Sequence, residues 1–134
     1  MIFGIGTDLV NLSRIEATFA RFGQHFVSRL LMPEERVRFD TLTQHRKQVR
    51  FLAQRFAAKE AIVKALGTGF AHGMWIRDCG FIQNEWGKPL VIWSVRGATL
   101  ASQLGAGAGF ITLTDEGGLV MAVAMLERAL QVGA

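Results

Sequence analysis

The helix predicted from Phe51 to Leu66 constrains the fold more than any other segment. It is apolar on nearly every side and still carries four charges. Bulky apolar residues recur along it at helical spacing, and alanines cover most of the remaining surface. Because such a helix must be buried on most sides, we expect the rest of the chain to fold around it.

The four charges on this helix need partners, since an ionised group removed from water costs several kcal/mol unless it is paired or binds a ligand. Arg55 and Lys59 project from within the bulky apolar arc. Glu60 and Lys64 lie one turn apart on its flank. Glu60 is therefore either paired with Lys64 or bound to a cation, and the helix is a candidate site.

The length of the chain favours a single domain, and its net charge favours an acidic binding partner. The 134 residues predict a single domain over residues 1–134, and the net charge of +4 favours a nucleic acid, a phosphate-rich small molecule or an acidic protein. Cys79 is the only cysteine, which suits a reducing compartment and excludes an intrachain disulfide. Asp8 interrupts the first apolar run too early for a signal peptide or a membrane span, so we expect a cytoplasmic protein.

Periodicity predicts an α+β fold with a largely antiparallel sheet packed with the long central helix. The expected strands are residues 2–10, 75–84, 89–95, 109–114 and 118–127. The expected helices are a first one capped by Asn11 or Ser13 and ending at Gly23, then residues 24–31, 33–42, 51–66 and 97–104. Residues 43–50 read as a basic linker or first turn.

Asp8 follows two glycines, Gly4 and Gly6, near the end of the first predicted strand. Either it points into a cleft or it caps the next helix. Together with Glu60 it would suit Mg²⁺, which usually takes one or two protein carboxylates and lets phosphate oxygens and water complete its shell. The three histidines show no ligand spacing, and a single cysteine argues against structural zinc.

Other basic and glycine-rich segments are candidate phosphate contacts. Gly67, Thr68 and Gly69 could present backbone N–H groups to a phosphate, although a helix C-cap also explains Gly67. Arg46 and Lys47 fit a solvated basic face better.

Arg14, Thr18 and Arg21 form one row on the first helix. It is either a plain surface stripe or a docking face for an acidic partner.

Two motifs together resemble one known family. Residues 4–10 read GIGTDLV, and residues 55–69 read RFAAKEAIVKALGTG. They resemble the holo-[acyl-carrier-protein] synthases, the small bacterial 4′-phosphopantetheinyl transferases, and the similarity extends over most of the chain. The resemblance implies transfer of the phosphopantetheine arm of coenzyme A to a serine of apo acyl carrier protein, with release of adenosine 3′,5′-bisphosphate. Such a reaction serves fatty-acid or polyketide synthesis.

The resemblance also implies roles in catalysis. Asp8 and Glu60 would hold Mg²⁺, and Lys64 would contact the transferred phosphate. The proton of the carrier serine would go to Glu60 or to a metal-bound water, which the sequence does not distinguish.

Coenzyme A and the carrier protein imply further contacts. Candidate contacts for coenzyme A phosphates are Arg55, Lys59, Lys64, Gly67, Thr68 and Gly69. Arg14 and Arg21 would dock acyl carrier protein. The family resemblance also implies a homotrimer that holds coenzyme A between neighbouring subunits, which would account for the high apolar content.

The chain departs from the family pattern at one strand, where many members have a Ser-Leu-Ser-His segment. Here the segment from Thr112 to Asp115 reads TLTD, so an imidazole has no role at this place, and Asp115 is given no catalytic part.

A non-catalytic basic module that binds a nucleotide or nucleic acid is the alternative function. It would show salt-dependent binding without a need for Mg²⁺. The aromatic residues lie mainly in apolar runs and are not interleaved with a basic stripe, so we expect no nucleic-acid partner and no membrane association. A catalytically inactive structural subunit is a further alternative, and the joint presence of Asp8, Glu60 and Lys64 argues against it.

Overall fold

The computed structural model describes residues 1–130, so the last four residues of the expected domain lie outside the described part. The predicted α+β class is confirmed, with antiparallel pairing between neighbouring strands. One sheet has the order β1-β5-β4 and the other consists of β2 and β3. The strands are β1 (Ile2–Asn11), β2 (Cys79–Gln83), β3 (Pro89–Trp93), β4 (Ala106–Glu116) and β5 (Leu119–Arg128).

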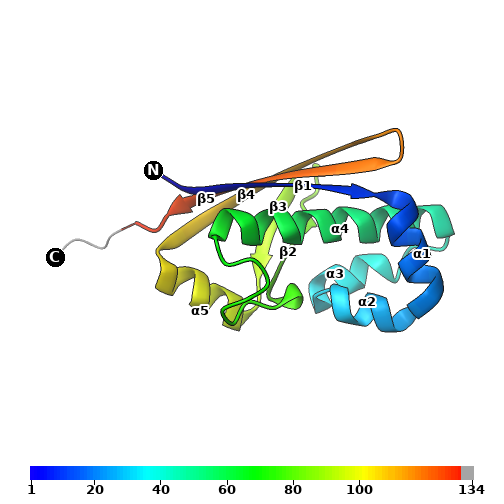
Figure 1. The fold of residues 1–134 in the computed structure, drawn as a ribbon, viewed down its shortest axis with the longest axis horizontal. Helices are drawn as coiled ribbons and strands as arrows, with labels where there is room; N and C mark the ends of the chain where they lie inside the picture. Colours follow the sequence, from blue (N-terminus) through cyan, green and yellow to red (C-terminus); the bar gives the residue numbers. More distant parts are fainter. Residues whose placement is uncertain (131–134) are drawn as a thin grey trace.

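The helices surround one long central helix, α4, which runs along one face of the three-stranded sheet (Figure 1). They are α1 (Leu12–Phe22), α2 (Gln24–Leu30), α3 (Pro33–Phe39), α4 (His45–Leu66), the short 3₁₀ helix η1 (Ile76–Asp78) and α5 (Val95–Leu104). None of the helices that the structure describes is both long enough and apolar enough to cross a membrane.

The central helix is buried as its sequence predicts. Leu52, Ala58 and Ile62 are fully inaccessible to solvent. The helix ends at Gly67, whose φ of 90° places it in the left-handed conformation that glycine adopts at helix ends. At its other end the helix begins at His45, so the expected start near Phe51 was too late. Of the two alternatives for residues 43–50, the first turn is confirmed from His45 onward and the linker is not. Val49 is buried there while Arg46 stays exposed, so the basic segment forms amphipathic first turns.

A second correction concerns the residues before β2. The strand was expected from Trp75, but Trp75 to Asp78 form a 3₁₀ turn, and pairing with β3 starts at Cys79. The Asp78 carboxylate accepts hydrogen bonds from the Trp75 N–H at 2.8 Å and from the Ser94 hydroxyl at 2.8 Å. This side chain therefore closes a turn that the apolar pattern alone does not predict.

The face of the three-stranded sheet that points away from α4 is exposed and apolar. Strand alternation places every second residue of β1 and β5 on this face, and Leu9 pairs with Met121 across it. Its large exposed apolar side chains are Ile5, Leu9, Phe110, Leu119 and Met121. A contiguous apolar surface of this kind is typical of a site of association with another chain.

Candidate active site

Two glycines bring β1 into direct contact with the backbone of α4. A Cβ atom on Gly4 would overlap the carbonyl oxygen of Ala65, and one on Gly6 would overlap that of Ala61. Only a residue without a side chain permits this approach. The same inward-facing alternation continues to Asp8, which is thereby directed towards the end of α4 that carries Glu60 and Lys64.

Asp8, Glu60 and Lys64 form a partly exposed charged cluster, which we call the open cluster. Lys64 Nζ lies 3.3 Å from Asp8 Oδ1 and donates a hydrogen bond to the Thr7 carbonyl oxygen at 3.0 Å. Glu60 is half-buried one turn before Lys64. Burial raises the pKa of Glu60, the Asp8 carboxylate raises this pKa further, and Lys64 partly opposes both effects. The structure thus brings together the three residues predicted to be catalytic.

The structure excludes one of the alternatives for these residues. Asp8 lies within β1 and does not cap α1, because Asn11 is the N-cap and its side chain accepts a hydrogen bond from the Ser13 N–H at 3.0 Å. Lys64 forms its ion pair with Asp8, and its charge also acts on Glu60, so one ammonium group serves two carboxylates. Binding of a cation by Glu60 stays a prediction.

The open cluster fits a hard divalent cation. It offers two carboxylates for one ammonium group. A cation between Asp8 and Glu60 would relieve the repulsion between their negative charges. Within residues 1–130 no group of three or more His, Cys, Asp or Glu side chains could hold a metal ion. Two carboxylates are nevertheless a common protein contribution to a Mg²⁺ site that is completed by substrate phosphate and water.

Arg55 and Lys59 belong to a different cluster, which is closed to solvent and centred on Glu35 of α3. Lys59 Nζ lies 2.6 Å from Glu35 Oε1 and donates a second hydrogen bond to the Cys79 carbonyl oxygen at 2.6 Å. Lys59 and Glu35 are 0% exposed and Arg55 is 2% exposed. We call Glu35, Arg55 and Lys59 the closed cluster. Their charges are offset within this chain, and contact of Arg55 and Lys59 with coenzyme A stays a prediction.

The Arg55 guanidinium is held between two aromatic rings. It lies 3.8 Å from the centre of the Phe51 ring and 3.9 Å from that of Phe81. Arg55 Nε is 3.7 Å from Glu35 Oε2, and no residue of the described chain accepts a hydrogen bond from it. Burial lowers the pKa of Arg55 to about 10, although Glu35 opposes this effect, so the side chain remains charged at neutral pH.

Glu35 is the residue that sequence reasoning missed. Two cations inside an apolar arc require a buried anion, and that requirement was the available signal. Glu35 lies in the first turn of α3, where it accepts a hydrogen bond from the Met32 N–H at 2.9 Å. Gly80 makes room for it, since a Cβ atom there would lie 2.5 Å from Glu35 Oε2. The Cys79 thiol is buried beside it, and burial raises the Cys79 pKa to about 12.

The loop after α4 uses much of its own hydrogen-bonding capacity. The N–H groups of Gly67 and Gly69 both donate to the carbonyl oxygen of Val63, at 3.0 and 3.2 Å. The Thr68 hydroxyl donates to the Gly69 carbonyl oxygen at 2.7 Å. The loop therefore caps the helix, and its expected contact with phosphate stays a prediction.

The predicted docking arginines lie exposed on α1. The Thr18 hydroxyl donates to the carbonyl oxygen of Arg14 at 3.0 Å, and the Arg21 guanidinium lies 5.0 Å from the centre of the Phe22 ring. Both side chains are therefore free to meet an acidic partner at the surface.

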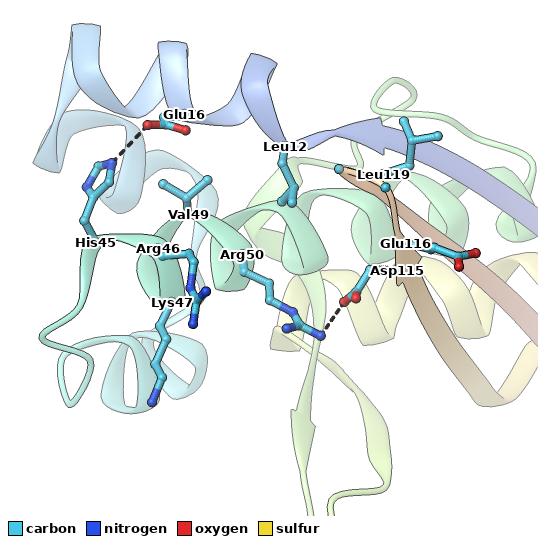
Figure 2. Close-up of a pocket in the computed structure, with 12 residues that line it drawn as sticks. Leu12, Glu16, His45, Arg46, Lys47, Val49, Arg50, Asp115, Glu116 and Leu119 are labelled. Carbon is cyan, nitrogen blue, oxygen red and sulfur yellow. Dashed lines mark ion pairs between the residues drawn. The ribbon is translucent and has the colours of Figure 1, made fainter.

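A cavity of about 500 Å³ opens at the first turns of α4, beside the turn between β4 and β5 (Figure 2). Arg46, Lys47 and Arg50 line it, and Arg50 forms a 2.7 Å ion pair with Asp115 across it. Sequence reasoning placed Arg46 and Lys47 on a plain solvated face and assigned no role to Asp115. Arg50 precedes Glu60 by ten residues, so about 15 Å of helix separates this cavity from the open cluster.

Similarity to known proteins agrees with this geometry. Residues 4–124 match the model of the 4′-phosphopantetheinyl transferase superfamily. The holo-[acyl-carrier-protein] synthase of Vibrio cholerae is 44% identical over 128 residues, which are 96% of this chain and 99% of the relative.

Solved structures give the same result. The holo-[acyl-carrier-protein] synthase of Neisseria meningitidis has a TM-score of 0.88 at 37% identity, covering 96% of this chain and 100% of the other. That of Helicobacter pylori, in complex with coenzyme A, has a TM-score of 0.78 at 26% identity, covering 92% and 99%. The chain therefore belongs to the holo-[acyl-carrier-protein] synthase family of the 4′-phosphopantetheinyl transferase superfamily.

Proposed function

We propose that this chain is a one-domain holo-[acyl-carrier-protein] synthase. It transfers the 4′-phosphopantetheine group of coenzyme A to a serine of apo acyl carrier protein and releases adenosine 3′,5′-bisphosphate. The observation that carries the proposal is the open cluster, in which Asp8 and Glu60 face each other beside Lys64. The reaction supplies carrier protein for fatty-acid or polyketide synthesis.

Asp8 and Glu60 would hold Mg²⁺ in this enzyme, because hard carboxylate oxygens are its preferred protein ligands. When bound, the ion neutralises charge on the pyrophosphate of coenzyme A and on the leaving phosphate. Glu60 and Asp8 contribute by keeping two anionic oxygens at one place, a costly arrangement that Gly4 and Gly6 enforce through the close packing of β1 on α4.

Lys64 would place a positive charge next to the transferred phosphate. Its ammonium group is half-exposed and is oriented by the Thr7 carbonyl oxygen, so one or more of its N–H groups can turn towards a substrate. Gly67, Thr68 and Gly69 follow directly at the end of the helix and would border the same phosphates.

Arg46 and Lys47 are suited to a further phosphate of coenzyme A, because they add two cations to the lining of the cavity at the first turns of α4. Arg55 and Lys59 would act indirectly, by fixing α4 against α3 and β2 through Glu35.

The partners follow from exposed surfaces. Arg14 and Arg21 would dock the acyl carrier protein through its acidic surface. The apolar outer face of the sheet, which includes Ile5, Leu9 and Met121, would be covered in a homotrimer. We place the enzyme in the cytoplasm as part of the proposal, because its single cysteine is a buried free thiol of the kind found in reducing compartments.

Mass spectrometry of the carrier protein tests the proposal. The purified chain is incubated with apo acyl carrier protein, coenzyme A and Mg²⁺, and the carrier should gain the mass of one phosphopantetheine group. A carrier with alanine at the acceptor serine is the matched control, and a reaction with chelator measures the need for metal. No mass gain with several apo carriers would overturn the proposed activity, and full activity in chelator would overturn the metal role of Asp8 and Glu60.

A further inference from the structure

Three adjoining hollows form a continuous groove along α1, α2 and η1. The hollow beside α1, of about 270 Å³, shares Thr18 and Phe26 with a second of about 350 Å³. The second shares His25, Arg29 and Ile76 with a third of about 590 Å³, which reaches η1. We call this the α1–α2–η1 groove, and its first end includes Leu9, the residue after Asp8 of the open cluster.

The groove is basic along its whole length. Arg14 lines its first part, Arg29 its middle, and Arg77 its far end. Within residues 1–130, no Asp or Glu lines any of the three hollows. The cavity at the start of α4 is different, since Glu16, Asp115 and Glu116 are among its lining residues. Uncompensated cations along a groove attract an anionic partner and raise the rate of encounter.

Trp75 gives the far end of the groove an exposed aromatic anchor. Its side chain is 61% exposed although the Arg96 guanidinium lies 4.0 Å from its ring centre. Asp78 fixes the backbone of Trp75 and the side chain of Arg96, because its carboxylate accepts the Trp75 backbone N–H at 2.8 Å and lies 3.3 Å from Arg96 Nε. A tryptophan held in place before binding loses little conformational entropy on contact, and Trp and Arg are the residue types that dominate binding energy at interfaces.

We propose that the α1–α2–η1 groove extends the docking surface for acyl carrier protein well beyond the two arginines of α1. An acidic surface of the apo carrier would lie along Arg29 and Arg77, with an apolar side chain of the carrier against Trp75. This inference depends on the proposed function, since the carrier is the substrate. Because the first hollow is lined by Leu9 and Val10, which follow Asp8 in β1, contact along the groove would orient the acceptor serine towards the open cluster.

Steady-state kinetics with apo carrier as the varied substrate tests the groove. Trp75→Ala and the pair Arg29→Glu with Arg77→Glu should each raise the KM for the carrier about tenfold, as loss of an interface hot spot does. The kcat and the KM for coenzyme A should stay unchanged. The effect of the charge reversals should shrink as ionic strength rises, because salt screens exposed charges.

Matched controls lie at the other end of β2. Trp86→Ala removes an equally large aromatic side chain that is 87% exposed, and Lys88→Glu reverses an exposed charge on the same turn. Both should leave the KM for the carrier at the wild-type value. Trp75→Phe, which keeps an aromatic ring at the anchor, should recover most of the affinity lost in Trp75→Ala.

Two results would overturn the extended docking surface. One is that the double variant Arg29→Glu with Arg77→Glu keeps the wild-type KM for the carrier while Arg14→Ala raises this KM. The other is RNA binding that depends on Arg29 and Arg77 while the carrier KM does not. A wild-type chain that transfers nothing overturns the proposed function instead. The groove is then tested by calorimetric titration of apo carrier, where weaker binding by the variants supports it and equal binding refutes it.

Discussion

Two charged clusters lie on the same helix and differ in composition and in access to solvent. The closed cluster has two cations and one anion, with Glu35 and Lys59 fully buried. The open cluster has two anions and one cation, and its Lys64 is 52% exposed. Ten residues of α4, Arg55 to Lys64, thus carry both an internal ion-pair network and a surface site.

The difference separates a structural role from a catalytic one. In the closed cluster, Glu35 accepts hydrogen bonds from Met32, Lys59 and Phe81, so the anion is saturated by this chain. In the open cluster, burial and then the Asp8 carboxylate raise the pKa of Glu60, so two carboxylates oppose each other. A charged cluster near solvent is open to a ligand, whereas a buried ion-pair network in a core stabilises one arrangement of helices and strands.

The same chemical change in the two clusters should give opposite outcomes, and the larger effect is on folding. Glu35→Gln keeps the shape of the side chain but leaves Arg55 and Lys59 without a counter-charge. Breaking a buried ion pair in this way costs about 3–5 kcal/mol. Urea denaturation should show this loss, and Glu34→Gln, on the exposed neighbour, should change the free energy of unfolding little.

A second variant sharpens this prediction. Adding Lys59→Met to Glu35→Gln removes one of the two stranded cations, so part of the lost stability should return in a double-mutant cycle. If Glu35→Gln unfolds at the same urea concentration as Glu34→Gln, the closed cluster contributes nothing to stability, and its structural role is refuted.

Glu60→Gln should spare the fold and remove activity. The substitution relieves the repulsion from Asp8, so the free energy of unfolding should be equal or slightly higher. Loss of one of two metal-binding carboxylates should lower kcat at least about 100-fold, which corresponds to about 2.7 kcal/mol of transition-state stabilisation. Turnover is measured alongside in Lys64→Gln, a variant on the same helix face. Unchanged turnover in Glu60→Gln would refute the metal-binding role of Glu60.

The sequence predicted the surroundings of the open cluster better than those of the closed one. Local signals are strong at the open cluster, where glycines, a carboxylate on a strand and a carboxylate on an Ala-rich helix lie in two short segments. The motif resemblance then joined the two segments. The helix end at Gly67 and the Asn11 cap are also short-range features, and the structure confirms both.

The closed cluster depends on contacts between segments that are distant in sequence. Glu35 and Lys59 are 24 positions apart, and Phe81 is 46 positions from Glu35. Periodicity shows that Arg55 and Lys59 need partners but not which of the acidic residues supplies one. The start of α4 and the turn before β2 were missed for a related reason, since burial of Val49 and the bonds of Asp78 arise only in the folded chain.

Gly6→Ala should act on the open cluster through the backbone. The added methyl group would overlap the carbonyl oxygen of Ala61, so either β1 must move away from α4 or the backbones of β1 and α4 must be strained at this contact. Overpacking of this kind costs about 1–3 kcal/mol. Displacement of β1 would also carry Asp8 away from Glu60, so metal affinity measured by calorimetry should fall. Ala17→Gly, an exposed change on α1, should leave metal affinity unchanged, and a Gly6→Ala protein with normal affinity would contradict the positioning by glycine.

The smallest effect is a pH dependence of stability that arises from Glu60 of the open cluster. The pKa of Glu60 is raised in the folded protein, so the folded chain keeps a proton over a pH range in which the unfolded chain has lost it. Stability should therefore fall as pH rises from the ordinary pKa of a glutamate through the raised pKa of Glu60. Solvent screening limits the loss to less than about 1 kcal/mol, because the group is only half-buried. Thermal denaturation without metal should detect the loss, Glu60→Gln should abolish it, and Mg²⁺ should reduce it by stabilising the ionised carboxylate. An unaltered pH dependence in Glu60→Gln would mean that the pKa of Glu60 is not raised in the folded chain.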